Sequence, residues 1–419
     1  MNRLRSTGWK SCCLFLAVFA LTLVAGPASA QDKGPIKIGF ISPGTGNWAQ
    51  MGKDMLSGFE MYLQEVGYKA GGRKIELIYE DEGADPSIAV NKARKLITRD
   101  NVHLLAGIFV TSAAYAVAPV ATQNQTPFVI TLSAGDDLTQ RHRSNWVVRT
   151  SFTASEFGFV AGDYAFKELG WKKAACIAMD YAWGHENIGA FQRKFEALGG
   201  KVIQKIWTPV NTTDFGPYVA NINREADGVF EVITGAAIIR FIKDMEASGL
   251  KQKMPILATG TSTDESLLPA LGDSGLGVIT VFNWSAALDN AQNKKWVAEV
   301  RKKMNKEAPM GAALCYDGAR WIVAALEKVK GNVEDKQALM KALREVELEK
   351  SLRGAFSMDK YGHPAQDIYV RKVEKSTESP AGYKNTVIKT YPKATQFNGF
   401  DPEEYLKTPP NTRDYPPLK

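Results

Sequence analysis

The sequence predicts an α/β protein with two similar lobes, each built on a parallel central sheet. Strand-like and helix-like segments alternate along most of the chain, which is typical of parallel sheets covered by helices. The order of features in the first half is repeated in the second. The chain has 419 residues, enough for two domains of ordinary size.

The first 30 residues have the pattern of a secretory signal peptide. Arg3, Arg5 and Lys10 form a basic start, residues 14–24 are apolar and uncharged, and Ala28-Ser29-Ala30 is a small-x-small cleavage pattern. The apolar run is too short for a spanning helix, which needs about 20 residues. We therefore expect cleavage after Ala30 and a periplasmic mature protein.

Net charge and cysteine content give two further predictions. The formal net charge is +7, part of it lies in the signal segment, and the remainder is not clustered. This balance predicts no nucleic-acid partner. Cys176 and Cys315 remain after cleavage, and we expect two buried thiols, with a disulfide between them as the open alternative.

The first half begins with an apolar β-branched strand at residues 36–41 and a glycine-rich turn at 44–48. Asp85-Pro86 supplies an N-cap and a first-turn proline for a later helix. The segments expected after the turn are helix 53–65, strand 74–79, helix 87–99, strand 102–109, helix 112–123 and strand 127–131.

The second half restarts the same order. Gly199-Gly200-Lys201 takes the place of Gly71-Gly72-Arg73 between a helix and a strand. The expected segments are strand 174–179, helix 186–198, strand 202–207, a helix opened by 213–217, strands 226–233, 254–258 and 277–282, helices 293–305, 312–330 and 336–346, and β segments 356–358 and 367–373. The proline-rich tail, 391–419, is expected to be an extended strap or a loose end.

The turn Gly44-x-Gly46-x-x-Ala49 matches a dinucleotide-binding fingerprint. Its acidic partner should follow about 20 residues on, and Glu80 and Asp81 lie much farther along the chain. Trp48 would also crowd a pyrophosphate. An exported Rossmann-type NAD(P)-dependent oxidoreductase therefore stays only as an alternative from another class.

Candidate binding residues follow the predicted strands, where α/β proteins place their ligands. Thr111-Ser112 opens a helix and can hold an anion, although such a pair is also an ordinary N-cap. Small residues after the strand 127–131 let a ligand approach the backbone. The full set of ligand-binding candidates is Asn47, Trp48, Thr111, Ser112, Ser133, Ala134, Gly135, Tyr181, Trp183, Thr234, Thr261, Asn283 and Trp284.

The sequence offers no catalytic set. None of the four histidines, at 103, 142, 185 and 363, has metal-ligand spacing with another His, Cys, Asp or Glu. No nucleophile elbow and no phosphate-loop lysine occurs. We expect no catalytic residue, metal or cofactor, and a binding protein in place of an enzyme.

These residues resemble those of the periplasmic substrate-binding proteins of ABC importers, of the leucine/isoleucine/valine-binding type. The resemblance runs from Pro35 to about Lys375. The matching stretches are 36–52, 71–79 with Asp81 and Asp85-Pro86, Ala89-Val90 with Ala93 and Leu96-Ile97, 118–121, 148–150, 213–215 and 316–319.

The resemblance implies a type I periplasmic binding protein, with two Rossmann-like lobes joined by a three-segment hinge. Lobe 1 would comprise 31–150 plus 285–355, and lobe 2 would comprise 151–284 plus 356–390. The family binds a solute between the lobes, closes around it, and delivers it to a membrane permease. It implies a monomer, a ligand carboxylate held at Thr111-Ser112 and at 133–135, and an aromatic lid at Trp183.

One departure from the family bears on the ligand. Amino-acid-binding members hold the α-ammonium with an acidic side chain, at a position that aligns with Thr261. A hydroxyl cannot neutralise an ammonium, and Asp264 would replace the acid only if the loop runs differently. We therefore expect an aromatic or other small carboxylate without an ammonium, with a branched-chain or other amino acid as the alternative. A sensory receptor subunit is a third possibility.

Overall fold

The computed structural model describes residues 33–83 and 85–418. The predicted signal peptide therefore lies outside the described residues. Internal contacts group Pro35–Lys419 into one compact unit. The paragraphs below concern that unit.

The first part of this unit forms a six-stranded sheet in the order β2-β3-β1-β4-β5-β6. β3, β1, β4, β5 and β6 are parallel, and β2 pairs antiparallel with β3. Ile38 in the central strand lies opposite Leu77 and Leu104. The strands are β1 (Ile36–Ser42), β2 (Lys69–Ala70), β3 (Arg73–Asp81), β4 (Leu104–Gly107), β5 (Phe128–Ile130) and β6 (Val147–Arg149).

Helices from two distant parts of the chain pack with this sheet. They are α1 (Ala49–Glu65), α2 (Pro86–Thr98), α3 (Thr111–Gln123), α9 (Ala291–Met304), α10 (Met310–Lys328) and α11 (Lys336–Arg344). The first three and α10 contact its strands, while α9 and α11 pack against α10, α9 through Trp296 and Tyr316. α1 meets α10 at Gly58, where a Cβ atom would lie 2.0 Å from the carbonyl oxygen of Ala312. Only glycine allows this approach. We call the sheet and these helices lobe 1.

The second sheet has nine strands in the order β12-β13-β14-β11-β10-β9-β7-β8, with β15 paired to β14. β8, β7, β9, β10 and β11 are parallel, and β14 is antiparallel to β11. The strands are β7 (Lys173–Met179), β8 (Lys201–Thr208), β9 (Gly228–Val232), β10 (Ile256–Thr259), β11 (Ile279–Phe282), β12 (Glu347–Leu348), β13 (Phe356–Met358), β14 (Pro364–Lys375) and β15 (Tyr383–Ala394).

The sheet of β7–β11, β14 and β15, with its helices, is lobe 2. The helices are α4 (Ala154–Lys167), α5 (Ala182–Ala197), α6 (Gly216–Ala220), α7 (Ala237–Ala247) and α8 (Leu268–Leu271). The predicted α/β alternation is confirmed in both lobes. The segments α4, α7, β15 and α12 (Pro402–Lys407) were not predicted.

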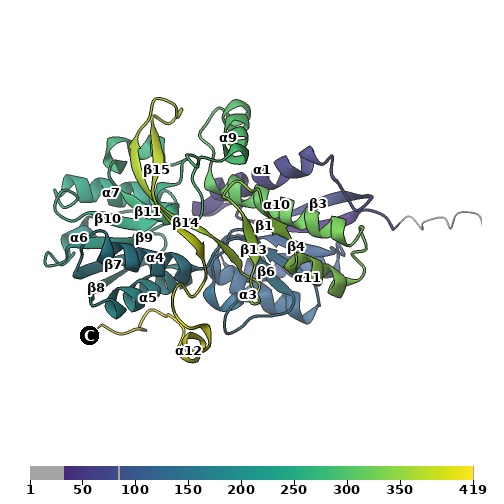
Figure 1. Cartoon of the computed structure of the whole chain (residues 1–419), viewed down its shortest axis with the longest axis horizontal. Coiled ribbons are helices and arrows are strands. Elements are labelled where there is room, and N and C mark those ends of the chain that lie inside the picture. The colour runs from purple at the N-terminus through teal and green to yellow at the C-terminus, as the bar shows by residue number, and fades with distance from the viewer. Residues whose placement is uncertain (1–32, 84, 419) are drawn as a thin grey trace, which may run out of the picture. The chain divides into compact units, whose positions relative to one another are not determined.

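The long strand β14 links the two lobes and crosses the middle of the view in Figure 1. Its later residues pair with β11, where Tyr369 lies opposite Phe282. Its first residues pair with β13, and the turn before it accepts a hydrogen bond at Gly362 from the Arg149 N–H at the end of β6. The three-segment hinge and its residue boundaries stay a prediction.

Residues 395–418, which we call the C-terminal strap, touch both lobes. Arg141, between β5 and β6, donates to the carbonyl oxygens of Tyr405 and Thr408, at 3.1 and 2.9 Å. Arg193, on α5, donates to the Asn411 side chain at 2.7 Å. The Tyr405 ring is buried. Residues 391–394, predicted as part of the tail, belong to β15.

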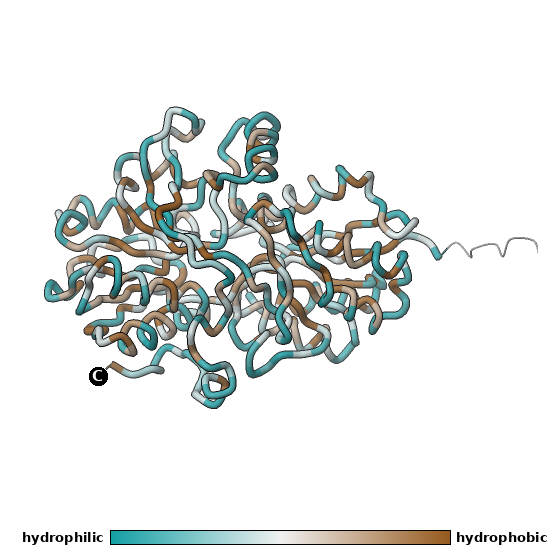
Figure 2. The backbone as a smooth tube through the Cα atoms, in the orientation of Figure 1, coloured by the Kyte–Doolittle hydropathy of each residue, from teal (hydrophilic) through white to brown (hydrophobic). Residues whose placement is uncertain are grey.

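Apolar segments gather in the strands and inner helix faces, which Figure 2 shows in brown. Cys176 on β7 and Cys315 on α10 are buried free thiols, which confirms that prediction. Burial raises the pKa of each thiol to about 12. Over 33–83 and 85–418, no helix combines the length and the apolar character that a membrane span needs.

Candidate ligand-binding site

Two adjacent cavities lie where strand ends of the two lobes face each other. The small cavity has a volume of about 20 Å³ and the large cavity about 120 Å³, and both are lined by Phe109, Thr234 and Thr261. The remaining lining of the small cavity is Thr111, Leu132, Ala134, Phe152, Tyr181 and Trp183. That of the large cavity is Asn47, Trp48, Gln50, Met51, Asp54, Gly235, Ala236, Asp264, Ser266, Leu267 and Met310.

Strand topology explains why these residues meet. Phe109 and Thr111 follow β4 in lobe 1, while Tyr181, Thr234 and Thr261 follow β7, β9 and β10 in lobe 2. The carboxyl ends of parallel strands share one edge of a sheet. The cavities are therefore built from both lobes at once.

Aromatic rings dominate the walls. The Trp48 ring centroid lies 5.9 Å from that of Phe109 and 6.1 Å from that of Tyr181. Phe152 and Trp183 lie 5.9 Å apart on the other side of the small cavity. Such walls provide faces and edges against which a flat ring can pack.

The N-termini of α3 and α5 both open at the small cavity, at Thr111 and at Tyr181. Neither helix start has a side-chain cap. Uncapped backbone N–H groups and the positive end of the helix dipole favour an anion. The indole N–H of Trp183 is also buried and makes no hydrogen bond within the described residues.

The side chains that line the small cavity carry no formal charge. The acid Glu82 lies beside the start of α3, where its carboxyl group accepts from the N–H groups of Phe109 and Val110 at 2.9 and 2.6 Å. Burial raises the pKa of Glu82 to about 8. At neutral pH this carboxyl group is therefore mostly protonated and puts little negative charge beside α3.

The large cavity contains two acids, and both have partners. Asp54 pairs with the Lys306 ammonium at 2.7 Å. Asp264 accepts from the Met310 N–H at 2.8 Å and from the Ser266 N–H at 2.9 Å. Their hydrogen-bonding capacity is largely used within the protein.

Eight of the predicted binding residues line one of the two cavities. They are Asn47, Trp48, Thr111, Ala134, Tyr181, Trp183, Thr234 and Thr261. The other five, Ser112, Ser133, Gly135, Asn283 and Trp284, line neither cavity.

The neighbours of three of these residues explain their position. The Trp284 indole N–H donates to Asn293 at 2.8 Å, and its ring meets that of Trp296 edge-on. The Asn283 amide donates to Gln366 at 3.0 Å. The carbonyl oxygen of Gly135 accepts from the buried Arg149 guanidinium. Asn283 and Trp284 therefore act as buried packing groups near β14.

Sequence reasoning missed Phe109, Leu132 and Phe152 as lining residues. Each is an apolar residue at or after a strand end, and that pattern is equally typical of the core. The only available signal was their position, one or two residues from the candidates Thr111 and Ser133 or from the predicted lobe boundary at 150–151.

The glycine turn after β1 is closed by the protein itself. The Asp81 carboxylate accepts from the Gly44 N–H at 2.6 Å and from the Thr45 hydroxyl at 2.8 Å. A pyrophosphate at this turn would meet that carboxylate and be repelled. This geometry argues against a dinucleotide-binding site at the turn.

Ionisable side chains elsewhere do not assemble a metal site in the described part of the chain, where no group of three or more His, Cys, Asp or Glu residues is placed to hold an ion. His185 instead contacts Asp180, at 2.8 Å, and its ring meets Trp207 edge-on.

Comparison with known proteins agrees with the fold. A family model described as periplasmic binding protein matches residues 35–378. The chain is 33% identical over 385 residues to Leu/Ile/Val-binding protein homolog 6 of Brucella melitensis, covering 90% of this chain and 97% of that protein.

Solved structures give the same result. The solute-binding protein of an ABC transporter from Rhodopseudomonas palustris BisB5, in complex with 3,4-dihydroxybenzoic acid, has a TM-score of 0.81 at 32% identity, covering 86% of this chain and 98% of that one. A solute-binding protein from R. palustris in complex with benzoate has a TM-score of 0.80 at 27% identity, covering 86% and 98%. The predicted two-lobe fold and family resemblance are confirmed: the chain belongs to the periplasmic binding proteins of ABC transporters.

Proposed function

We propose that this protein captures a small aromatic carboxylate between its lobes and delivers it to the membrane permease of an ABC importer. The observation that carries the proposal is the pair of adjoining cavities: aromatic rings line both, and the small one has uncharged lining side chains and the N-termini of two helices. Family membership implies a periplasmic location. We also propose that the receptor is a monomer.

In this proposal the ligand carboxylate lies at the start of α3, against the backbone N–H groups and the Thr111 hydroxyl. The aromatic ring packs against Phe152 and Trp183. The hydroxyls of Tyr181 and Thr261 then face the far end of the ring, where a hydroxybenzoate carries its own hydroxyl. The lobes close over the ligand, with Trp48 and Thr234 meeting at the rim.

Two solved relatives support an aromatic acid, since they were crystallised with benzoate and 3,4-dihydroxybenzoic acid. The relative named as a Leu/Ile/Val-binding homologue supports the amino-acid alternative. An α-ammonium needs an acid with free capacity, because a buried unpaired charge costs several kcal/mol. Asp54 and Asp264 already have partners, so the charge balance favours the aromatic acid.

Isothermal titration calorimetry of the purified mature protein tests this function. Benzoate, 4-hydroxybenzoate and 3,4-dihydroxybenzoate should bind with one site, and leucine should bind at least tenfold more weakly in the cleft. Tight leucine binding with no response to any aromatic acid would contradict the proposal.

Two substitutions test the site. Trp183→Ala should weaken aromatic-acid binding strongly, because it removes a wall of the cavity. Trp207→Ala is the matched control, since Trp207 lies on β8 and lines neither cavity. Equal losses in both variants would remove Trp183 from the site.

A further inference from the structure

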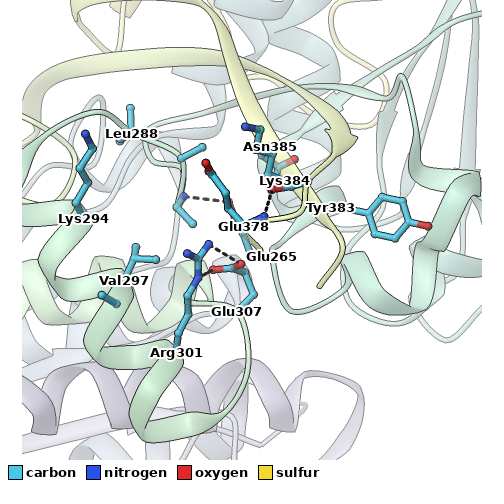
Figure 3. A pocket seen from close by; sticks show the side chains of 14 residues that line it. Glu265, Leu288, Lys294, Val297, Arg301, Glu307, Glu378, Tyr383, Lys384 and Asn385 are labelled. Carbon is cyan, nitrogen blue, oxygen red and sulfur yellow. Dashed lines mark hydrogen bonds and ion pairs between the residues drawn. The ribbon is translucent and has the colours of Figure 1, made fainter. Parts of the chain in front are cut away.

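A third cavity, with a volume of about 320 Å³, lies beside α9 (Figure 3). Its walls come from α9, from residues 286–288, and from residues 376–385, which comprise the turn after β14 and the start of β15. None of its lining residues lines the small or the large cavity. We call it the α9 pocket.

The floor of the α9 pocket contains a buried carboxylate with unused capacity. Glu265 is 1% exposed, and one of its oxygens, Oε1, accepts from the Ala286 N–H at 3.2 Å and lies 3.6 Å from an Arg371 nitrogen. The other oxygen, Oε2, is buried and makes no hydrogen bond within the described residues. The neighbouring Asn385 amide donates to the Thr263 carbonyl oxygen, at 2.7 Å. Burial raises the pKa of Glu265 to about 7, and Arg371 and the Asn385 side chain act in the opposite direction.

Most other charges of the pocket are already neutralised. Arg301 forms two hydrogen bonds with Glu307, both of 2.9 Å, and Lys294 pairs with Asp289 at 2.6 Å. Two charged lining side chains have no such partner. The side chains of Glu378 and Lys384 form no ion pair within residues 33–83 and 85–418.

The pocket therefore offers a buried acid with one oxygen free of hydrogen bonds at its floor, an acid and an ammonium at its walls, and an apolar side made by Leu288, Val297 and Ala298. A buried carboxylate oxygen is stabilised by a donor that carries positive charge. A free ammonium on Lys384 is complementary to a carboxylate. These groups match a molecule that carries both charges and a short apolar part.

We propose that the α9 pocket is a second binding site, separate from the cleft, for a small zwitterion of the amino-acid class. Its ammonium lies between Glu265 Oε2 and Glu378, its carboxylate faces Lys384, and its apolar part rests on α9. The site is independent of the aromatic ligand proposed for the cleft.

Calorimetry with leucine as the probe tests the site. Wild-type protein and the Trp183→Ala variant should both bind one leucine. Two analogues, 4-methylpentanoate without the ammonium and 3-methylbutylamine without the carboxylate, should bind at least tenfold more weakly. Leucine binding that disappears in Trp183→Ala would assign it to the cleft and overturn the second site.

Filling the pocket is the sharper test. Ala298 is exposed on α9 and lines the pocket, so Ala298→Trp occupies the space without disturbing the core. It should abolish leucine binding and leave aromatic-acid binding unchanged. Ala291→Trp, on the same helix but outside the lining, is the matched control and should keep both. Leucine binding that survives Ala298→Trp would overturn the proposal.

Removing the acids tests the ammonium contact. Glu265→Gln should weaken leucine at least tenfold, and Glu378→Gln several-fold. Since Glu265→Gln leaves Arg371 without its buried partner, its fold is checked by circular dichroism. If Glu265→Gln fails to fold, Glu378→Gln, at an exposed position, gives the same test. Unchanged leucine affinity in both Glu378→Gln and Ala298→Trp would refute the site.

Discussion

The indole N–H of Trp48 on lobe 1 donates a hydrogen bond to the hydroxyl of Thr234 on lobe 2, across 3.3 Å. Both side chains line the large cavity. The Thr234 hydroxyl in turn donates a hydrogen bond to the Met179 sulfur, at 3.7 Å. This pair is a direct link between the lobes beside the proposed ligand.

Trp48→Phe should weaken the binding of an aromatic acid by roughly 2–10-fold, because one hydrogen bond contributes a net of about 0.5–1.5 kcal/mol. The ring contact with Phe109 is kept. Calorimetry against 4-hydroxybenzoate measures the change. Trp146→Phe, a half-buried tryptophan outside both cavities, is the control and should bind as the wild type does. An unchanged affinity in Trp48→Phe would mean that this link does not favour the liganded state.

Thr261→Asp should lower the affinity for benzoate more than tenfold, since it places a carboxylate at the wall shared by both cavities. Two like charges separated by the length of the ring, about 7 Å, repel by roughly 2 kcal/mol at an effective dielectric constant of 20. Thr261→Asn has the same size and no charge, and should cost much less. Equal affinities of the Asp and Asn variants, measured by calorimetry, would show that the ligand is not anionic near Thr261.

Glu82→Gln should change how stability depends on pH. Burial raises the pKa of Glu82 from 4.5 to about 8, so the folded protein holds a proton that the unfolded chain releases. The destabilisation caused by this difference in pKa is absent below pH 4.5, grows as the pH rises, and is complete above about pH 8. Between these pH values the free energy of unfolding should fall more steeply in the wild type than in Glu82→Gln. The two slopes should differ by up to about 1.4 kcal/mol per pH unit.

Urea unfolding at pH 5, 6, 7 and 8 measures these slopes. Glu76→Gln on β3 is a control at an exposed position of a neighbouring strand segment. Parallel curves for wild type and Glu82→Gln would contradict the raised pKa.

Tyr405→Ala should destabilise the protein by about 3 kcal/mol, as is usual for a buried aromatic ring. The ring is 4% exposed, lies 5.6 Å from Phe159 and 5.8 Å from Phe397, and faces the guanidinium of Arg141 at 5.3 Å. Tyr405→Phe keeps these contacts and should cost far less. Urea denaturation distinguishes the two, and a Tyr405→Ala midpoint equal to the wild type would show that the strap adds no stability.

The sequence predicts the alternating segments well, because their apolar runs have the period of a strand or a helix. It fails at α4, whose residues from Ala154 to Ala165 are buried all round. Such a helix has no polar face to reveal its period. Gly158 adds to the difficulty: it looks like a helix breaker, yet its Cβ position lies 2.5 Å from the Asn187 carbonyl oxygen of α5.

The site is predicted in part for a similar reason. Strand order brings Thr111, Tyr181 and Thr261 to one edge, and that order can be read from the sequence. The direction in which a side chain points after the end of a strand cannot be read from the sequence. Trp183 and Trp284 both follow strands, but only Trp183 lines a cavity, while Trp284 packs against Trp296.

The two buried thiols have a practical consequence for watching this receptor move. Thiolates react with maleimide dyes, and a thiol with a pKa of about 12 is almost entirely protonated at neutral pH. Cys176 and Cys315 are also shielded from solvent. A cysteine introduced at an exposed position of each lobe would therefore react with the dyes in preference to Cys176 and Cys315. Energy transfer between the two dyes would then report the distance between the lobes without removal of either of these native cysteines.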